Sequence, residues 1–177
     1  MPQSAKIDPV LASIIERRLT NITREMGYTM LRTTRSPILN QARDFVTGIF
    51  DEEGRQLAQT EYIPIISCMW PAIKETLKLF ESEIYPGDVF LFNDTFRGGN
   101  QLADVMTYKP IFHEGEMVGW VAAKGHVADI GGAVAGGYNP YATEVWQEGL
   151  RIPPVKIIEK GKLRLSRIHI SEPTRPR

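Results

Sequence analysis

The sequence has little of what would place a chain across a membrane or outside the cell. Cys68 is its one cysteine, so no disulfide can form within the chain. No apolar run approaches the roughly 18 residues that a membrane-spanning helix requires. Residues 1–10 also lack a basic segment followed by an apolar one, the mark of a signal peptide. These absences predict a cytoplasmic protein without a membrane partner.

An excess of charge of either sign is absent as well. Lys plus Arg and Asp plus Glu both number 21, which gives no broad electrostatic footprint for nucleic acid or for an anionic surface. The chain has 177 residues, of which 42% are hydrophobic and 24% charged. That length and composition fit one globular domain, or a piece of one, with a core of its own.

The N-terminal part of the sequence has a long helical pattern. Asp8 and Pro9 are types preferred at a helix N-cap and at the first helical position. Apolar residues then recur at helical spacing, which predicts an amphipathic helix with a core-facing stripe: Leu11, Ile15, Leu19, Ile22, Met26 and Met30. A loop is expected over 33–41, because Pro37 disfavours a helical conformation at Ser36.

A β-hairpin is predicted next. The runs Phe45–Phe50 and Gln56–Gln59 flank an Asp-Glu-Glu-Gly turn. Asp44 stands immediately before the first strand, where it is either a solvated residue at the strand end or a carboxylate that points into a site.

A second helix is expected with Ser67 as its cap, Pro71 in its first turn and an end before Pro86. Cys68 lies near its start. We expect a small buried apolar side chain there, and the alternative is a thiol activated by the helix dipole.

Three further strands are predicted, and they form an antiparallel meander: 89–92, 105–112 and 117–124. The entry of one strand and the exit of its antiparallel partner lie at the same edge, so Asp104 and His126 are expected side by side. His113 lies in the turn at the other end of this hairpin, and we discount it as a ligand.

The C-terminal part predicts a short helix over 142–150, an extended run over 151–158 and a hairpin turn at 159–162. The whole pattern predicts an α+β fold with a long N-terminal helix, β-hairpins, an antiparallel meander and short helices.

Polar side chains gather at two glycine-rich loops. They are Asn100, Gln101 and Asp104 after one double glycine, and His126 and Asp129 before the other. Glycine lets the backbone pass close to another group, and clustered polar residues on such loops are typical of enzyme sites. The alternative is that these residues only mark turns.

The residue types in this cluster suit a divalent metal. Asp44, Asp104 and His126 supply two carboxylates and an imidazole, a set suited to Zn²⁺, Mn²⁺ or Fe²⁺ with positions left for water or substrate. Gln101 can add a neutral amide oxygen. Asp129 is expected to accept a hydrogen bond from His126 and fix its tautomer. A metal-bound water with a pKa of about 7 would attack a carbonyl carbon or an acyl phosphate.

Three motifs, in this order, resemble the hydantoinase B/oxoprolinase family: FNDTFRGGNQLADV, KGHVADIGG and ATEVWQEGLRIPPVKI. With ARDF and the N-terminal helix, the likeness covers residues 7–162. This family comprises B-type subunits of ATP-dependent hydantoinases, 5-oxoprolinases and lactamases, and is related to a subunit of acetone and acetophenone carboxylases. The resemblance implies a partner A-type subunit of actin-like ATPase fold, which binds ATP and phosphorylates the substrate carbonyl, and a metal site for ring opening on the B-type subunit.

The resemblance also implies the site residues. The metal ligands of the family fall on Asp44, on Gln101 with Asp104, and on His126, and we expect Asp104 and His126 to be catalytic. Gln101 stands where histidine is expected in many members. The identity of the metal therefore stays open: it is zinc, manganese or magnesium, or a metal that binds only when the partner subunit is present. We expect zinc or manganese.

The family's subunits are much longer than this chain. Residues from about 165 resemble a translated sequencing adapter, so we expect 1–164 to be the N-terminal part of a hydantoinase B-like domain and 165–177 an assembly artefact. Without 165–177, three arginines and one glutamate are lost from the 21 of each sign, so 18 basic and 20 acidic residues remain.

Three functions are consistent with these features. The first is a subunit of an ATP-dependent hydrolase that opens a cyclic amide such as a hydantoin, 5-oxoproline or a lactam; the chain without a partner is then expected to have little activity. The second is a subunit of a ketone carboxylase, which adds carboxylate to a phosphorylated enol. The third is a non-catalytic scaffold whose glycine loops serve a subunit interface, and Gln101 favours it.

Overall fold

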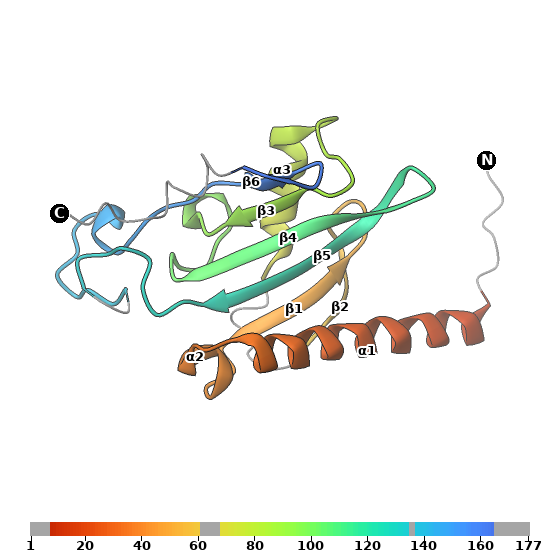
Figure 1. The fold of residues 1–177 in the computed structure, drawn as a ribbon, viewed down its shortest axis with the longest axis horizontal. Helices are drawn as coiled ribbons and strands as arrows, with labels where there is room; N and C mark the ends of the chain where they lie inside the picture. Colours follow the sequence, from red (N-terminus) through yellow and green to blue (C-terminus); the bar gives the residue numbers. More distant parts are fainter. Residues whose placement is uncertain (1–7, 61–67, 135–136, 165–177) are drawn as a thin grey trace.

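The computed structural model of the chain describes residues 8–60, 68–134 and 137–164. Within these residues, seven strands form one antiparallel sheet in the order β2-β1-β5-β4-β3-β6-β7 (Figure 1). The strands are β1 (Phe45–Phe50), β2 (Gln56–Gln59), β3 (Val89–Phe92), β4 (Asp104–His113), β5 (Glu116–His126), β6 (Val155–Glu159) and β7 (Lys162–Leu163). The helices are α1 (Pro9–Thr33), α2 (Pro37–Asn40), α3 (Trp70–Phe80), η2 (Thr95–Arg97) and η3 (Val145–Gln147). The expected α+β class is confirmed.

The β4–β5 hairpin is the centre of the sheet. Asp104 pairs with His126 at one end, and His113 pairs with Glu116 at the other. Glu114 and Gly115 make the turn with φ values of 51° and 89°, the left-handed conformation that two-residue hairpin loops require. The predicted meander is confirmed, and His113 lies at the end of the hairpin away from Asp104.

Helix α1 covers one face of the sheet. The side chain of Asp8 accepts a hydrogen bond from the Val10 amide, which confirms the predicted cap. Thr47 of β1 donates to the Thr23 carbonyl at 2.8 Å and fixes the helix on the sheet. The first half of α1 extends past the sheet (Figure 1), and Leu11 and Ile15 stay about half exposed. The predicted apolar stripe therefore faces the sheet only along its C-terminal part.

Helix α3 covers the opposite face and closes the core. Alternate positions of β1, β3, β4 and β5 point toward α3, because successive side chains of a strand point to opposite faces. The buried cluster on this side comprises Val46, Phe50, Met69, Ala72, Ile73, Phe90, Phe92, Met106, Tyr108, Trp120 and Ala122. The ring of Phe90 stacks on Tyr108 and meets the Trp120 ring edge to face. Full burial of each large apolar side chain contributes about 2 kcal/mol.

Three predicted elements differ from the structure or lie outside it. The expected loop over 33–41 contains the one-turn helix α2, because Pro37 suits a first helical position. The expected helix over 142–150 is reduced to the single turn η3, held by a reciprocal capping box between Glu144 and Gln147. The predicted cap Ser67 lies outside the described residues. Among the described helices, none has the length and apolar character needed to cross a membrane.

Candidate functional site

Asp104 and His126 meet at one end of the β4–β5 pair. Their Cα atoms are register partners, and Nδ1 of His126 lies 3.2 Å from Oδ1 of Asp104. Both side chains point to the α3 face and are almost fully buried, with 2% and 7% of their surface exposed. Burial excludes competing water, which strengthens the contact between carboxylate and imidazole. The predicted juxtaposition is confirmed.

Asp44 joins this pair from the start of β1. Its Oδ2 lies 3.8 Å from Nδ1 of His126, and its carbonyl accepts a hydrogen bond from the His126 amide at 3.0 Å. The Asp44 amide in turn donates to the Ile38 carbonyl in α2. The short helix that the sequence did not predict therefore anchors Asp44, and the carboxylate points into the site.

Gln101 completes the acid–imidazole cluster, the name used here for Asp44, Gln101, Asp104 and His126. Its amide nitrogen Nε2 lies 3.0 Å from Oδ1 of Asp104 and 3.1 Å from Nδ1 of His126. The hydroxyl of Tyr138 donates to Oε1 of Gln101 at 3.3 Å, and the Tyr138 ring stacks on the imidazole of His126. Tyr138 thus sets which end of the amide faces the carboxylate.

The cluster has the spacing of a divalent-cation site, but one of its three atoms is the amide nitrogen Nε2 of Gln101, which does not bind a cation. Oδ1 of Asp104, the Gln101 amide and Nδ1 of His126 form a triangle with edges of 3.0, 3.1 and 3.2 Å. Ligand atoms about 2.1 Å from one shared cation are spaced about 3.0 to 3.4 Å apart in octahedral and tetrahedral sites. Within the described residues, no group of three or more His, Cys, Asp and Glu side chains is arranged to hold a metal. The fit therefore depends on Gln101 turning its amide to present Oε1.

Lys124 is a site residue that the sequence reasoning missed. It is two positions before His126 on the same face of β5, and its ammonium group donates to the Cys68 carbonyl at 2.8 Å and to Oδ1 of Asn100 at 3.0 Å. Burial lowers the pKa of Lys124 to about 8, while the Asp104 carboxylate opposes that shift. The lysine on the core face of an otherwise apolar strand was the available signal, since buried lysines are rare.

Asp129 does not have the expected role. Its Oδ1 accepts a hydrogen bond from the Gly131 amide at 2.8 Å and so stabilises its own loop. The physical reason is the preference of Asp for capping an amide two residues further on. Nδ1 of His126 faces Asp104 instead. The imidazole is therefore oriented by Asp104 and not by Asp129.

The double glycines are explained by the protein's own backbone. A Cβ atom on Gly99 would lie 2.7 Å from the Asn93 carbonyl oxygen, and one on Gly132 would lie 2.5 Å from the Glu148 carbonyl oxygen. Close approach is confirmed at both positions, but the approaching group is the chain itself. These glycines shape the loops that carry the site residues.

Cys68 is exposed, which contradicts the expectation of a buried apolar side chain. The neighbouring Met69 is fully buried in the core on the α3 side of the sheet. Adjacent side chains in a non-helical segment point in different directions, so Met69 occupies the space that was expected for Cys68.

Known proteins match this chain over most of its described length. The sequence model for hydantoinase B/oxoprolinase matches residues 8–173. Caprolactamase subunit beta from Pseudomonas jessenii is 41% identical over 159 residues, which are 89% of this chain and 27% of that protein. The 5-oxoprolinase PfmaA from Pestalotiopsis fici is 34% identical over 158 residues, 89% of this chain and 12% of that protein.

Two solved structures share the fold. The ATP-dependent caprolactamase from Pseudomonas jessenii superposes with a TM-score of 0.87 at 39% identity, over 94% of this chain and 29% of that chain. A nucleotide-free acetone carboxylase superposes with a TM-score of 0.86 at 27% identity, over 93% of this chain and 22% of that chain. The chain spans less than a third of the length of each of these relatives.

The family match extends over nearly all of the chain and includes every residue of the acid–imidazole cluster. On this evidence the chain belongs to the hydantoinase B/oxoprolinase family.

Proposed function

We propose that the complete protein is the B-type subunit of an ATP-dependent hydrolase that opens a cyclic amide, either a lactam, 5-oxoproline or a hydantoin. The observation that carries this proposal is the buried triangle of Asp104, Gln101 and His126, with Asp44 beside it. The 41% identity to a caprolactamase subunit supports an amide as the bond that is broken.

The proposed cofactor is a divalent metal, zinc or manganese, held by Asp44, Gln101, Asp104 and His126. Such an ion, when bound, polarises an amide carbonyl and brings the pKa of a bound water to about 7. The carboxylates of Asp44 and Asp104 lie beside one imidazole and repel each other. A doubly charged cation between them would offset this repulsion.

The chain's own residues are proposed to act around that centre. Asp104 orients the imidazole of His126 through its contact with Nδ1, the nitrogen that faces the proposed metal. The ammonium group of Lys124 provides positive charge near Asp104. Tyr138 stacks on the imidazole and shields it from solvent. Asp104 and His126 are therefore the proposed catalytic pair.

The proposed partner is an A-type ATPase subunit that binds ATP and activates the substrate carbonyl. Its support lies in the relatives: one is named a subunit beta, and the solved caprolactamase is ATP-dependent. Hydrolysis of an unstrained amide is slow, and phosphorylation of its oxygen converts it to a better electrophile. The B-type subunit alone is accordingly proposed to be inactive.

A second candidate is a subunit of an ATP-dependent ketone carboxylase. The specific observation in its favour is the acetone carboxylase structure, which superposes over 93% of this chain with a TM-score of 0.86. The lower identity, 27% against 39% for the caprolactamase, places it second.

The test is an assay of the full-length subunit assembled with its ATPase partner. The complex is incubated with ATP and caprolactam, 5-oxoproline or hydantoin, and in parallel with ATP, bicarbonate and acetone, while ring-opened acid, carboxylated product and ADP are measured. Metal content is measured by mass spectrometry on the same preparation. Ring opening with stoichiometric metal is expected. Carboxylation would select the second candidate, and unchanged turnover after complete metal removal would refute the metal site.

A further inference from the structure

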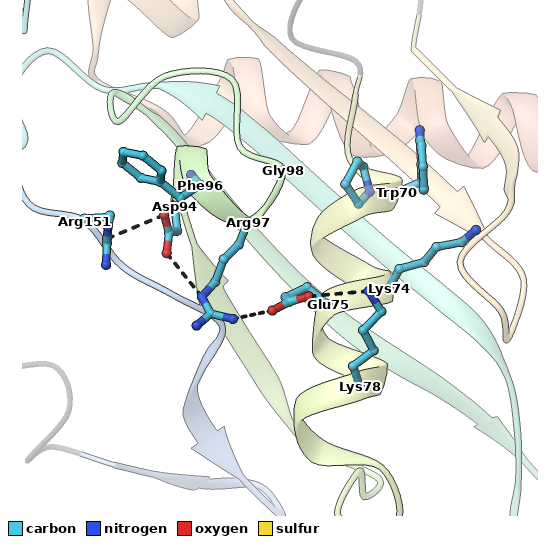
Figure 2. A pocket seen from close by; sticks show the side chains of 10 residues that line it. Trp70, Lys74, Glu75, Lys78, Asp94, Phe96, Arg97, Gly98 and Arg151 are labelled. Atoms are coloured by element: carbon cyan, nitrogen blue, oxygen red, sulfur yellow. Dashed lines mark hydrogen bonds and ion pairs between the residues drawn. The ribbon is translucent and has the colours of Figure 1, made fainter. Parts of the chain in front are cut away.

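A polar pocket lies beside α3, apart from the acid–imidazole cluster. It is formed by one side of α3, the turn η2, Gly98 and Arg151, and has a volume of about 490 Å³ (Figure 2). None of Asp44, Gln101, Asp104 and His126 lines it. The pocket therefore needs an explanation of its own.

Cations outnumber anions in this pocket. Its lining contains four cationic side chains, Lys74, Lys78, Arg97 and Arg151, against the two carboxylates of Glu75 and Asp94. An excess of two positive charges in a concave place attracts an anion more strongly than the same charges do on a flat surface.

The two carboxylates hold the cations in place. Figure 2 shows a chain of contacts in which Arg97 bridges Glu75 and Asp94, and Arg151 approaches Asp94 from the other side. Nε of Arg97 and Nε of Arg151 lie 3.5 and 3.6 Å from the oxygens of Asp94, whose side chain is fully buried. This arrangement fixes both guanidinium groups from one side and leaves their other N–H groups available.

Aromatic rings orient Arg151. Its guanidinium carbon lies 5.2 Å from the centre of the Phe96 ring and 4.8 Å from that of the Trp146 ring. In the part of the chain that the structure describes, Arg151 has an ion pair and these ring contacts but no hydrogen bond. A guanidinium whose plane is fixed by rings, and whose terminal N–H groups make no hydrogen bond, can bind a phosphate or carboxylate through two parallel hydrogen bonds.

The buried Asp94 carboxylate holds Arg97 by charge and not by a close hydrogen bond. Oδ2 of Asp94 is inaccessible and accepts no hydrogen bond among the described residues, although Nε of Arg97 lies 3.5 Å away as an ion-pair partner. A purely structural ion-pair network would require neither the excess of positive charge nor the unused donors.

We propose that this pocket binds a small organic anion, with Arg151 and Arg97 donating to its phosphate or carboxylate group and Lys74 and Lys78 at the rim. The ligand chemistry is that of a phosphate or carboxylate. The proposal does not depend on the function proposed above, because the pocket shares no residue with the acid–imidazole cluster.

The test is calorimetric titration of the full chain at constant ionic strength, with inorganic phosphate, glycerol 3-phosphate, malate and hexaglutamate as separate probes and chloride as the background ion. Trp70, which lines the pocket, and Trp146, whose ring contacts Arg151, provide a fluorescence signal. We expect saturable binding of phosphates or of malate, and the preferred probe distinguishes a phosphate site from a carboxylate site. Binding of hexaglutamate alone would overturn the proposal in favour of a protein-docking surface, and absence of saturable binding would overturn it altogether.

Variants assign the binding to the pocket. Arg151→Gln is expected to weaken binding about tenfold or more, since a hydrogen bond to a charged group contributes about 1.5 to 3 kcal/mol. Arg151→Lys keeps the positive charge but cannot make two parallel hydrogen bonds, so it should give an intermediate loss of binding affinity. Lys109→Gln removes the same charge from an exposed position on the other face of the sheet and serves as the control. Equal binding by Arg151→Gln and Lys109→Gln, with both folded by circular dichroism, would refute the assignment.

Discussion

Nδ1 of His126 lies 3.2 Å from Oδ1 of Asp104, although 22 residues separate them in the sequence. The contact results from the β4–β5 hairpin, whose turn at Glu114 and Gly115 sets the register along its whole length. A shift of one residue in this register would turn one of the two side chains to the opposite face. The chemistry of the site therefore depends on a turn at the far end of the hairpin.

The first prediction concerns His126. We expect His126→Ala to lower turnover of the assembled complex about a hundredfold or more, because the loss of a proposed metal ligand would remove several kcal/mol of transition-state stabilisation. Bound metal, measured by mass spectrometry, should fall in parallel.

The matched control is His113→Ala, which removes an exposed histidine from the other end of the same hairpin. It should leave both turnover and metal content unchanged. Full activity of His126→Ala in the complex would instead support a scaffold role.

The second prediction concerns Gln101. Imidazole is a stronger ligand than an amide for zinc and similar ions, so Gln101→His should raise metal affinity about tenfold or more. Chelator competition on the full chain measures this affinity without any assay of turnover. Unchanged or weaker metal binding by Gln101→His would show that position 101 is not a ligand.

Tyr138→Phe tests how the amide of Gln101 is oriented. It removes the hydroxyl that donates to Oε1 and keeps the ring that stacks on His126. Since Oε1 then becomes free to turn toward the cluster, metal affinity should rise slightly. Chelator competition with the wild type measured in parallel checks this, and a large loss of affinity would contradict it.

The third prediction concerns pH. Burial lowers the pKa of Lys124 from 10.5 to about 8, so above about pH 8 the folded chain loses a proton that the unfolded chain keeps up to pH 10.5. The unfolded state then binds more protons, and stability contributed by this group rises with pH across that window. The full effect is about 3 kcal/mol, because one pKa unit corresponds to about 1.4 kcal/mol.

Urea unfolding at several pH values measures this effect, with Lys124→Met as the reference that lacks the titrating group. The difference in unfolding free energy between wild type and variant should change in favour of the wild type from pH 8 to 10.5. Two parallel pH curves would contradict the prediction.

The fourth prediction concerns Asn93, a fully buried side chain that joins the loop before Asp104 to the segment before β6. Its amide nitrogen donates to the carbonyls of Leu102 and Leu150, and its oxygen accepts from the amide of Ile152. Asn93→Ala leaves these three buried backbone groups without their partner, which should cost about 3 kcal/mol or more. Asn21→Ala, at an exposed position of α1, should cost nothing measurable in the same urea experiment.

Much of the fold followed from local patterns. The cap at Asp8, the β1–β2 hairpin and the register that brings Asp104 opposite His126 were all predicted, because capping, alternation and turn chemistry act between residues close in sequence. The same local rules missed α2 and overestimated the helix over 142–150. Both are single turns, for which propensity is too weak to decide between helix and loop.

The sequence by itself determined the strand register, the family likeness and therefore which side chains are candidates for chemistry. Only the tertiary structure decided how they are used: Asp44 turns inward, Asp129 caps its own loop, Tyr138 stacks on His126, Cys68 is exposed, and Lys124 is buried beside Asn100. Each of these outcomes depends on packing and desolvation between segments distant in the chain, and no pattern of neighbouring residues encodes them.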